Sequence, residues 1–168
     1  ATVAAAIPSV RVADTHFNHD MMIESGLRPK DYERKLIRNW NKQVKDEDTV
    51  ILLGDISWRN DYSVLEKLHG RKILVRGNHD KHSCEAFMKV FDFACDSFTM
   101  DYMGINIIFT HKPLKRFSQD VNIHGHLHDK PALRDKRHIL ISLEKMGYCV
   151  FPLKGIIKKW KKLNMEGC

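Results

Sequence analysis

The chain has 168 residues, 43% of them hydrophobic, and a formal net charge of +7, values typical of one globular domain spanning residues 1–168. No apolar stretch is long enough to span a membrane, and the apolar start lacks the basic region of a secretion signal. The four cysteines show no CxxC spacing, which argues against a disulfide framework or a zinc cage, so we expect a cytoplasmic protein with no membrane partner.

Short β-type runs alternate with helical patterns along the first two-thirds of the chain, and hairpins follow. In chain order the sequence first predicts a strand at 10–13, a helix over 32–44, a strand at 50–53 and a short helix that is capped by Asp61 and stops near Gly70. A strand at 73–75 and a helix over 84–91 follow. A hairpin turning at Met103-Gly104 then leads into a strand at 105–109, a strand at 121–123 comes next, and a second hairpin turning at Met146-Gly147 joins 139–143 to 148–151.

The end of the chain predicts one more helix, in which lysines surround apolar residues at helical spacing. The lysines are Lys154, Lys158, Lys159, Lys161 and Lys162, around Leu153, Ile156, Ile157, Trp160 and Leu163. We expect a docked helix with a solvated basic face. The positive charge would also suit an anionic partner such as a phosphorylated substrate or nucleic acid.

Each of the five predicted strands is followed directly by residues of the kind that bind metals. These residues are Asp14-Thr15-His16, Gly54-Asp55, Gly77-Asn78-His79-Asp80, His111, and His124-Gly125-His126-Leu127-His128. One such residue would be an ordinary turn residue. Because ligands of open α/β sheets bind beyond the carboxyl ends of the strands, five such loops are expected to converge on one site.

The predicted ligands are oxygen and imidazole nitrogen atoms, without thiolate. The pairs Asp14/His16 and His126/His128 each alternate along the chain, so both side chains of a pair share one face of extended backbone and can hold one ion. Such a set suits manganese, iron or zinc better than calcium, which requires more oxygen ligands. The glycines beside Asp55, Asn78 and His126 fit sharp turns and close backbone approach to the metals or the phosphate.

The ordered set Asp-x-His, Gly-Asp, Gly-Asn-His-Asp, His, Gly-His-x-His resembles the calcineurin-like metallophosphoesterases, in particular compact bacterial and phage-type members. The resemblance spans residues 14–128. It implies an α/β (α+β) fold, a four-layer α/β/β/α sandwich of two mixed β-sheets with flanking helices. It also implies a metal-dependent phosphoesterase that hydrolyses phosphodiester or phosphomonoester bonds with a hydroxide activated by two metals.

The same resemblance implies roles for individual residues. Asp14, His16 and His128 would hold one divalent transition metal ion, Asn78, His111 and His126 the other, and Asp55 would bridge them, with Mn²⁺ expected foremost and iron, zinc or nickel as alternatives. His79, following the ligand Asn78, would touch the phosphate and protonate the leaving group. Asp80 is the natural carboxylate to orient His79. Asn78 and His79 would bind substrate, and His19 faces either the substrate phosphate or solvent.

Two departures from the family pattern leave the ligands intact: Asn18 stands where glycine is common, and Asp129 replaces the usual asparagine. The segment Ile56-Ser57-Trp58-Arg59 differs from the Asp-Arg-Gly continuation of the protein Ser/Thr phosphatases and disfavours that branch. We therefore expect a small phosphate-ester substrate. A nuclease of the same superfamily and a scaffold protein on the same fold remain as alternatives; nucleic acid is not favoured, because no basic-aromatic track is evident.

Overall fold

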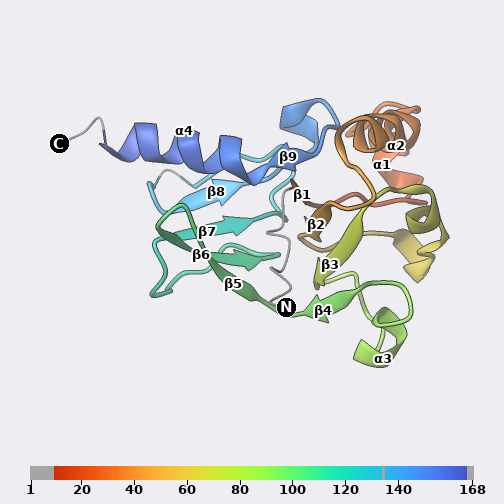
Figure 1. The fold of residues 1–168 in the computed structure, drawn as a ribbon. Coiled ribbons are helices and arrows are strands. Elements are labelled where there is room, and N and C mark those ends of the chain that lie inside the picture. Colours follow the sequence, from red (N-terminus) through yellow and green to blue (C-terminus); the bar gives the residue numbers. More distant parts are fainter. Residues whose placement is uncertain (1–9, 134, 166–168) are drawn as a thin grey trace.

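The computed structural model describes residues 10–133 and 135–165, which form two β-sheets flanked by helices (Figure 1). The first sheet has the strand order β4-β3-β2-β1-β9 and the second the order β5-β6-β7-β8. The strands are β1 (Val10–Val12), β2 (Thr49–Leu52), β3 (Arg71–Val75), β4 (Phe93–Cys95), β5 (Phe98–Tyr102), β6 (Ile105–Thr110), β7 (Val121–His124), β8 (His138–Leu140) and β9 (Phe151–Pro152). The helices are α1 (Met21–Glu24), α2 (Tyr32–Gln43), α3 (Cys84–Phe87) and α4 (Leu153–Met165), with 3₁₀ turns at Trp58–Asn60, Ser63–Lys67 and Glu144–Met146.

Both sheets are mixed. Strands β1 to β4 run parallel, with Val12 opposite Leu52, while β9 pairs antiparallel to β1. In the second sheet β6, β7 and β8 run parallel and β5 is antiparallel to β6. The predicted fold class, two mixed sheets with flanking helices, is therefore confirmed.

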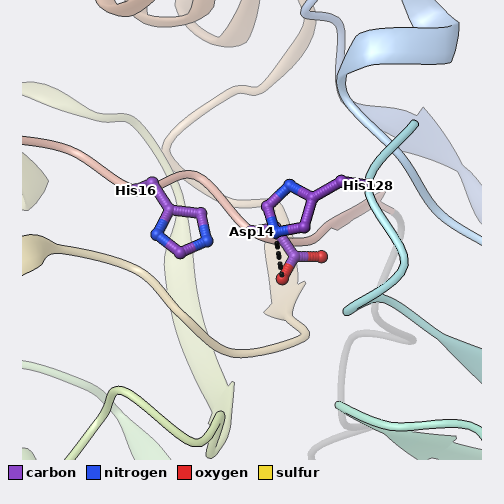
Figure 2. A group of neighbouring side chains, drawn as sticks. All are labelled: Asp14, His16 and His128. Atoms are coloured by element: carbon purple, nitrogen blue, oxygen red, sulfur yellow. Dashed lines mark ion pairs between the residues drawn. The ribbon is translucent and has the colours of Figure 1, made fainter. Parts of the chain in front are cut away.

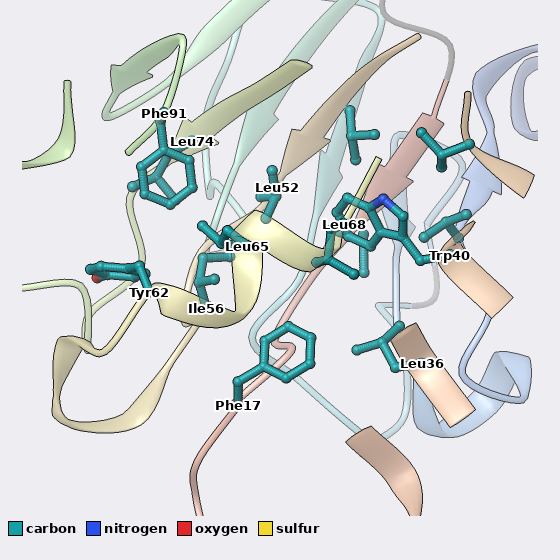
Figure 3. Packing of buried hydrophobic residues seen from close by; sticks show 14 of the residues in the cluster. Phe17, Leu36, Trp40, Leu52, Ile56, Tyr62, Leu65, Leu68, Leu74 and Phe91 are labelled. Atoms are coloured by element: carbon teal, nitrogen blue, oxygen red, sulfur yellow. The ribbon is translucent and has the colours of Figure 1, made fainter. Parts of the chain in front are cut away.

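The central strands β1 and β2 of the first sheet are buried on both faces, as is usual for parallel strands between two layers. Alternate residues such as Leu52 and Leu74 join the helix-side core together with Leu36 and Trp40 of α2 (Figure 3). Their neighbours, such as Leu53, meet the second sheet in a separate apolar cluster. The residues of that inter-sheet cluster include Ala13, Ile51, Leu53, Val75, Ile107, Phe109, Val121 and Ile123.

Helix α2 confirms the stripe predicted over residues 32–44. Leu36 and Trp40 are fully buried, and burying each contributes on the order of 1.5–3 kcal/mol. The Trp40 indole also donates a 2.9 Å hydrogen bond to the His69 carbonyl, which satisfies its polar atom inside the core.

The predicted hairpin at Met146-Gly147 is wrong. β8 pairs parallel to β7 in the second sheet, whereas β9 pairs antiparallel to β1 in the first. The 3₁₀ turn Glu144–Met146 carries the chain from one sheet to the other. Met146 and Gly147 do lie at a turn, but a local sequence pattern does not reveal which strand each flanking segment pairs with.

Other local predictions fared unevenly. The hairpin at Met103-Gly104 is confirmed by the antiparallel pairing of β5 and β6. The helix predicted from Asp61 is a 3₁₀ turn at Ser63–Lys67, with the Ser63 amide donating to Asp61. The helix predicted over 84–91 is limited to Cys84–Phe87.

Helix α4 lies along the β8 edge of the second sheet (Figure 1), where Leu153 and Ile157 are buried and Lys158 and Lys159 are exposed. The outer face of β7 is contacted by the loop after β6, since the Leu114 amide donates to Asn122. Within the described residues, no helix is long and apolar enough to cross a membrane.

Candidate metal centre

The seven predicted ligands all follow the carboxyl ends of parallel strands. Asp14 and His16 follow β1, Asp55 follows β2, and Asn78 follows β3. His111 follows β6, and His126 and His128 follow β7. Because the two sheets pack face to face, these strand ends meet at one edge of the sandwich.

A first group consists of Asp14, His16 and His128, whose ligand atoms lie within 4.8 Å of one another. The three side chains point toward one another (Figure 2), with Nε2 of His128 3.9 Å from Oδ1 of Asp14. In the described structure, two buried atoms of the group, Asp14 Oδ1 and His16 Nε2, have no hydrogen-bond partner. Buried polar atoms are normally satisfied, so this pair fits a cation between them.

A second group consists of Asp55, His111 and His126, with Asn78 beside them. Nδ1 of His111 donates to the Leu53 carbonyl at 2.8 Å, which leaves the lone pair of Nε2 directed into the group. That Nε2 lies 3.0 Å from Asn78 Oδ1, 3.0 Å from His126 Nδ1 and 3.4 Å from Asp55 Oδ2. Several acceptor atoms converging on one point again fit a bound cation.

Asp55 lies between the two groups. Its Oδ2 is 3.4 Å from His111 Nε2 in the second group and 3.9 Å from His16 Nε2 in the first. Its other oxygen accepts a 2.8 Å hydrogen bond from the His79 amide. This position is consistent with the bridging role that the sequence resemblance implies.

The backbone at the site is strained. Asp14, His16, Asp55, His126 and His128 all have positive φ, between 47° and 69°. Non-glycine residues seldom adopt this conformation, which costs on the order of 1–3 kcal/mol each and clusters at functional sites. This left-handed backbone replaces the extended one predicted at Asp14/His16 and His126/His128, and His126 and His128 lie in different groups in place of the predicted shared ion.

Two glycines permit close approach to the ligand carboxylates. A Cβ on Gly125 would lie 2.5 Å from Asp14 Oδ2, and one on Gly77 would overlap the Asp55 carboxylate. The backbone at these glycines therefore lies close to the carboxylates of Asp14 and Asp55, whereas the sequence predicted close approach to the metals or the phosphate.

The ionisation of the site also suits cations. Burial raises the pKa of Asp14 to about 7, and it outweighs the opposing effects of His111, His128 and the His126 amide. Burial and the charge of Arg28 lower the pKa of His16 to about 3, so its imidazole is neutral, the form that ligates metals. Burial alone would raise the pKa of Asp55, but its neighbours, among them the His79 amide that donates to it, hold it at about 2, so the carboxylate is ionised.

Comparison with known proteins agrees with this geometry. Residues 9–143 match the calcineurin-like phosphoesterase superfamily domain. The chain belongs to the calcineurin-like phosphoesterase superfamily. It is 31% identical to protein MJ1445 of Methanocaldococcus jannaschii over 90% of both chains, and 36% identical to the gene 66 protein of Mycobacterium phage D29 over 41% of this chain and 38% of that one.

Two solved structures are similar to this phosphoesterase. The Aquifex aeolicus protein AQ665 is 30% identical, with a TM-score of 0.76 over 89% of this chain and 97% of that one. An archaeal phosphodiesterase shares the fold at 22% identity, with a TM-score of 0.51 over 79% of this chain and 81% of that one. Membership of this family implies divalent metal ions, and the two ligand groups are where the phosphoesterase would hold them.

Asp80 has a different place from the one predicted. Its carboxylate is buried and accepts hydrogen bonds from the amides of Asp55 (2.7 Å), Gly77 (2.8 Å) and Ile56 (3.2 Å) and from the Tyr62 hydroxyl (3.2 Å). These bonds fix the loop that carries Asp55. The structure therefore makes Asp80 a support for a ligand loop, in place of the predicted contact with His79.

His79 and His19 lie at the open side of the phosphoesterase site. The His79 side chain is 40% exposed, with Nε2 3.9 Å from Asp55 Oδ2. The His19 ring stacks on Trp58 at 4.0 Å, and its Nδ1 lies 3.3 Å from Nδ1 of His16. The centroids of the Trp58 and His79 rings are 5.3 Å apart, so the Trp58 ring lies beside both histidine rings.

A buried ion pair that the sequence did not predict, Arg28–Glu144, lies next to the first group. Arg28 is buried and donates to Glu144 at 2.6 Å and to the carbonyls of Asp14 (2.7 Å) and Thr15 (2.8 Å). Glu144 in turn lies 3.1 Å from Nδ1 of His128. The pair holds the loop after β1 and fixes the His128 ring, so that its Nε2 faces Asp14. No local signal separates Arg28 from the other charged residues of its loop.

Proposed function

We propose that this protein is a metal-dependent phosphoesterase that hydrolyses phosphodiester or phosphomonoester bonds of small molecules and uses two divalent metal ions. Asp14, His16 and His128 would hold one ion, Asn78, His111 and His126 the other, with Asp55 shared. The observation that carries the proposal is the convergence of two ligand groups on one carboxylate, with Asp14 Oδ1 and His16 Nε2 left without a hydrogen bond among the described residues.

Two divalent ions held by these residues would supply positive charge for a phosphate and would make bound water acidic enough to provide hydroxide at neutral pH. The oxygen and nitrogen donors suit Mn²⁺ foremost, and iron, zinc or nickel as alternatives. Among the seven candidate ligands, Asp14 and Asp55 are the carboxylates that would offset that charge, so a phosphate ester would be attracted.

The residues at the open side would act on the substrate. His79 is exposed and close to Asp55 without belonging to either ligand group, so its ring is free to reach the phosphate and to protonate the leaving oxygen. Asn78 and His19 border the same opening and would help to orient the ester. Trp58 would restrain both histidine rings.

A metal-supplemented activity panel tests the proposal. The purified protein is treated with chelator, reloaded with Mn²⁺, and assayed on 4-nitrophenyl phosphate, bis(4-nitrophenyl) phosphate, cyclic nucleotides and single-stranded DNA. We expect Mn²⁺-dependent hydrolysis of an aryl ester. Cleavage of DNA alone would favour a nuclease, and no hydrolysis with any added metal would favour a binding protein.

A further inference from the structure

A cavity of about 410 Å³ opens beside the second ligand group. Asn78 and His111 line one side of it, so it is continuous with the position of the second metal. Arg76 lies in the loop after β3 of the first sheet and Lys112 in the loop after β6 of the second, so the cavity lies between two loops that carry candidate ligands. Its size matches that of small-molecule sites.

Lys112 follows the predicted ligand His111 directly and is exposed. Its backbone is fixed, because the Thr110 hydroxyl donates to the Lys112 carbonyl at 2.7 Å and itself accepts from Asn122 at 2.8 Å. Among the residues that the structure describes, no carboxylate forms an ion pair with the Lys112 ammonium group. The cavity is therefore lined by a cation that is carried on a fixed backbone and is available to a ligand.

The other cation of the cavity is compensated. The Arg76 guanidinium donates to Oδ1 of Asp96 from Nε at 2.8 Å and from Nη2 at 2.5 Å. One charge thus remains uncompensated on this wall, beside a site that already attracts phosphate. Ile108 and Leu114 add apolar surface that a sugar or base can cover.

We propose that this cavity binds a second phosphate of the substrate, next to the scissile one, through the Lys112 ammonium group. The inference rests on the proposed phosphoesterase function and narrows its substrates to esters with two phosphates. Lysine binds phosphate as a point charge and needs no fixed fork geometry, which suits a flexible ester. The second phosphate would come from a neighbouring nucleotide of a short oligonucleotide or from a pyrophosphate ester.

The test compares substrates that differ by one phosphate. The Mn²⁺-loaded protein is assayed on the dinucleotide TpT, on pTpT and TpTp, which carry a second phosphate on either side, and on a dinucleoside pyrophosphate. Loss of a hydrogen bond to a charged group is worth roughly tenfold. We expect Lys112→Ala to lose roughly tenfold in kcat/KM on at least one substrate with two phosphates and to retain its value on TpT.

Two further variants serve as controls. Lys112→Arg keeps the charge and should retain the preference for two phosphates. Lys115→Ala removes another exposed cation of the same loop that does not line the cavity, and should behave as the parent protein. An effect confined to pTpT or TpTp identifies an oligonucleotide as the source, and one confined to the dinucleoside ester identifies a pyrophosphate.

Equal losses of Lys112→Ala on TpT and on every substrate with two phosphates, or no loss at all, would overturn the inference. Failure of the proposed function is recognised separately, as absent hydrolysis of bis(4-nitrophenyl) phosphate. In that event calorimetry decides: thymidine 3′,5′-bisphosphate should bind more tightly than thymidine 5′-monophosphate, and Lys112→Ala should abolish the difference. An unchanged difference would reject the second-phosphate site.

Discussion

The two ligand groups are held in different ways. The first group is braced by side chains, since Glu144 contacts His128 and Arg28 holds the carbonyls of Asp14 and Thr15. In the second, the Leu53 carbonyl orients His111, and the Asp80 carboxylate fixes the loop that carries Asp55. Outer contacts fix the tautomer and orientation of metal-binding histidines. The first group can therefore be weakened by mutating an outer side chain such as Glu144, whereas the orientation of His111 depends on a backbone carbonyl that a side-chain mutation does not remove.

Asp55→Asn should have the largest effect, because Oδ2 of Asp55 lies 3.9 Å from His16 Nε2 in the first group and 3.4 Å from His111 Nε2 in the second. The neutral amide removes a charge that offsets both cations, so both should bind more weakly and turnover should fall by orders of magnitude. Metal content after dialysis and kcat on an aryl ester measure this. A variant with near-normal metal content and turnover would contradict the shared position of Asp55.

His79→Ala should spare both groups and act on chemistry. General acid catalysis is worth about 10²–10⁴-fold and matters more for basic leaving groups. The variant should keep its metals, lose much of its activity on an alkyl or nucleoside ester and lose less on a nitrophenyl ester. Equal losses on both would reject the proton-donor role and leave only phosphate positioning.

Glu144→Gln should separate the two groups. It keeps the shape of the side chain but removes the negative charge. Burial alone would raise the pKa of Glu144, but His128 and Arg28 hold it at about 2. Mutation of such outer partners typically costs about 10–100-fold in metal affinity, here at the first group only. Metal titration should show one weakened and one unchanged site, with the exposed Glu47→Gln as control. Equal weakening of both sites would contradict the separate bracing.

Neutralising Lys158, Lys159, Lys161 and Lys162 of α4 together should have the smallest effect. None of these lysines belongs to either ligand group, and surface charges at a distance are screened by salt. We expect kcat/KM on an aryl ester to stay within about twofold, since exposed charges contribute little. Selective loss of nucleic-acid cleavage with an unchanged aryl-ester rate would instead favour the nuclease alternative.

The sequence predicted the candidate ligands better than the side chains that hold their loops in place. All seven candidate ligands lie in loops that directly follow predicted strands, and such loops meet at one edge of the sheets. Arg28, Glu144 and Asp80 act through contacts with residues distant in sequence, such as Glu144 with Arg28, and no local period marks them. The false hairpin at Met146-Gly147 has the same cause, since strand partners are chosen by the whole sheet.

The central claim is that the convergent groups hold two metal ions. The direct measurement is elemental analysis of the protein purified without chelator, followed by activity before and after chelation and Mn²⁺ re-addition. The account predicts two transition metal ions per chain and activity that is lost on chelation and returns with metal. A protein with no bound transition metal, and no activity after re-addition, would contradict it.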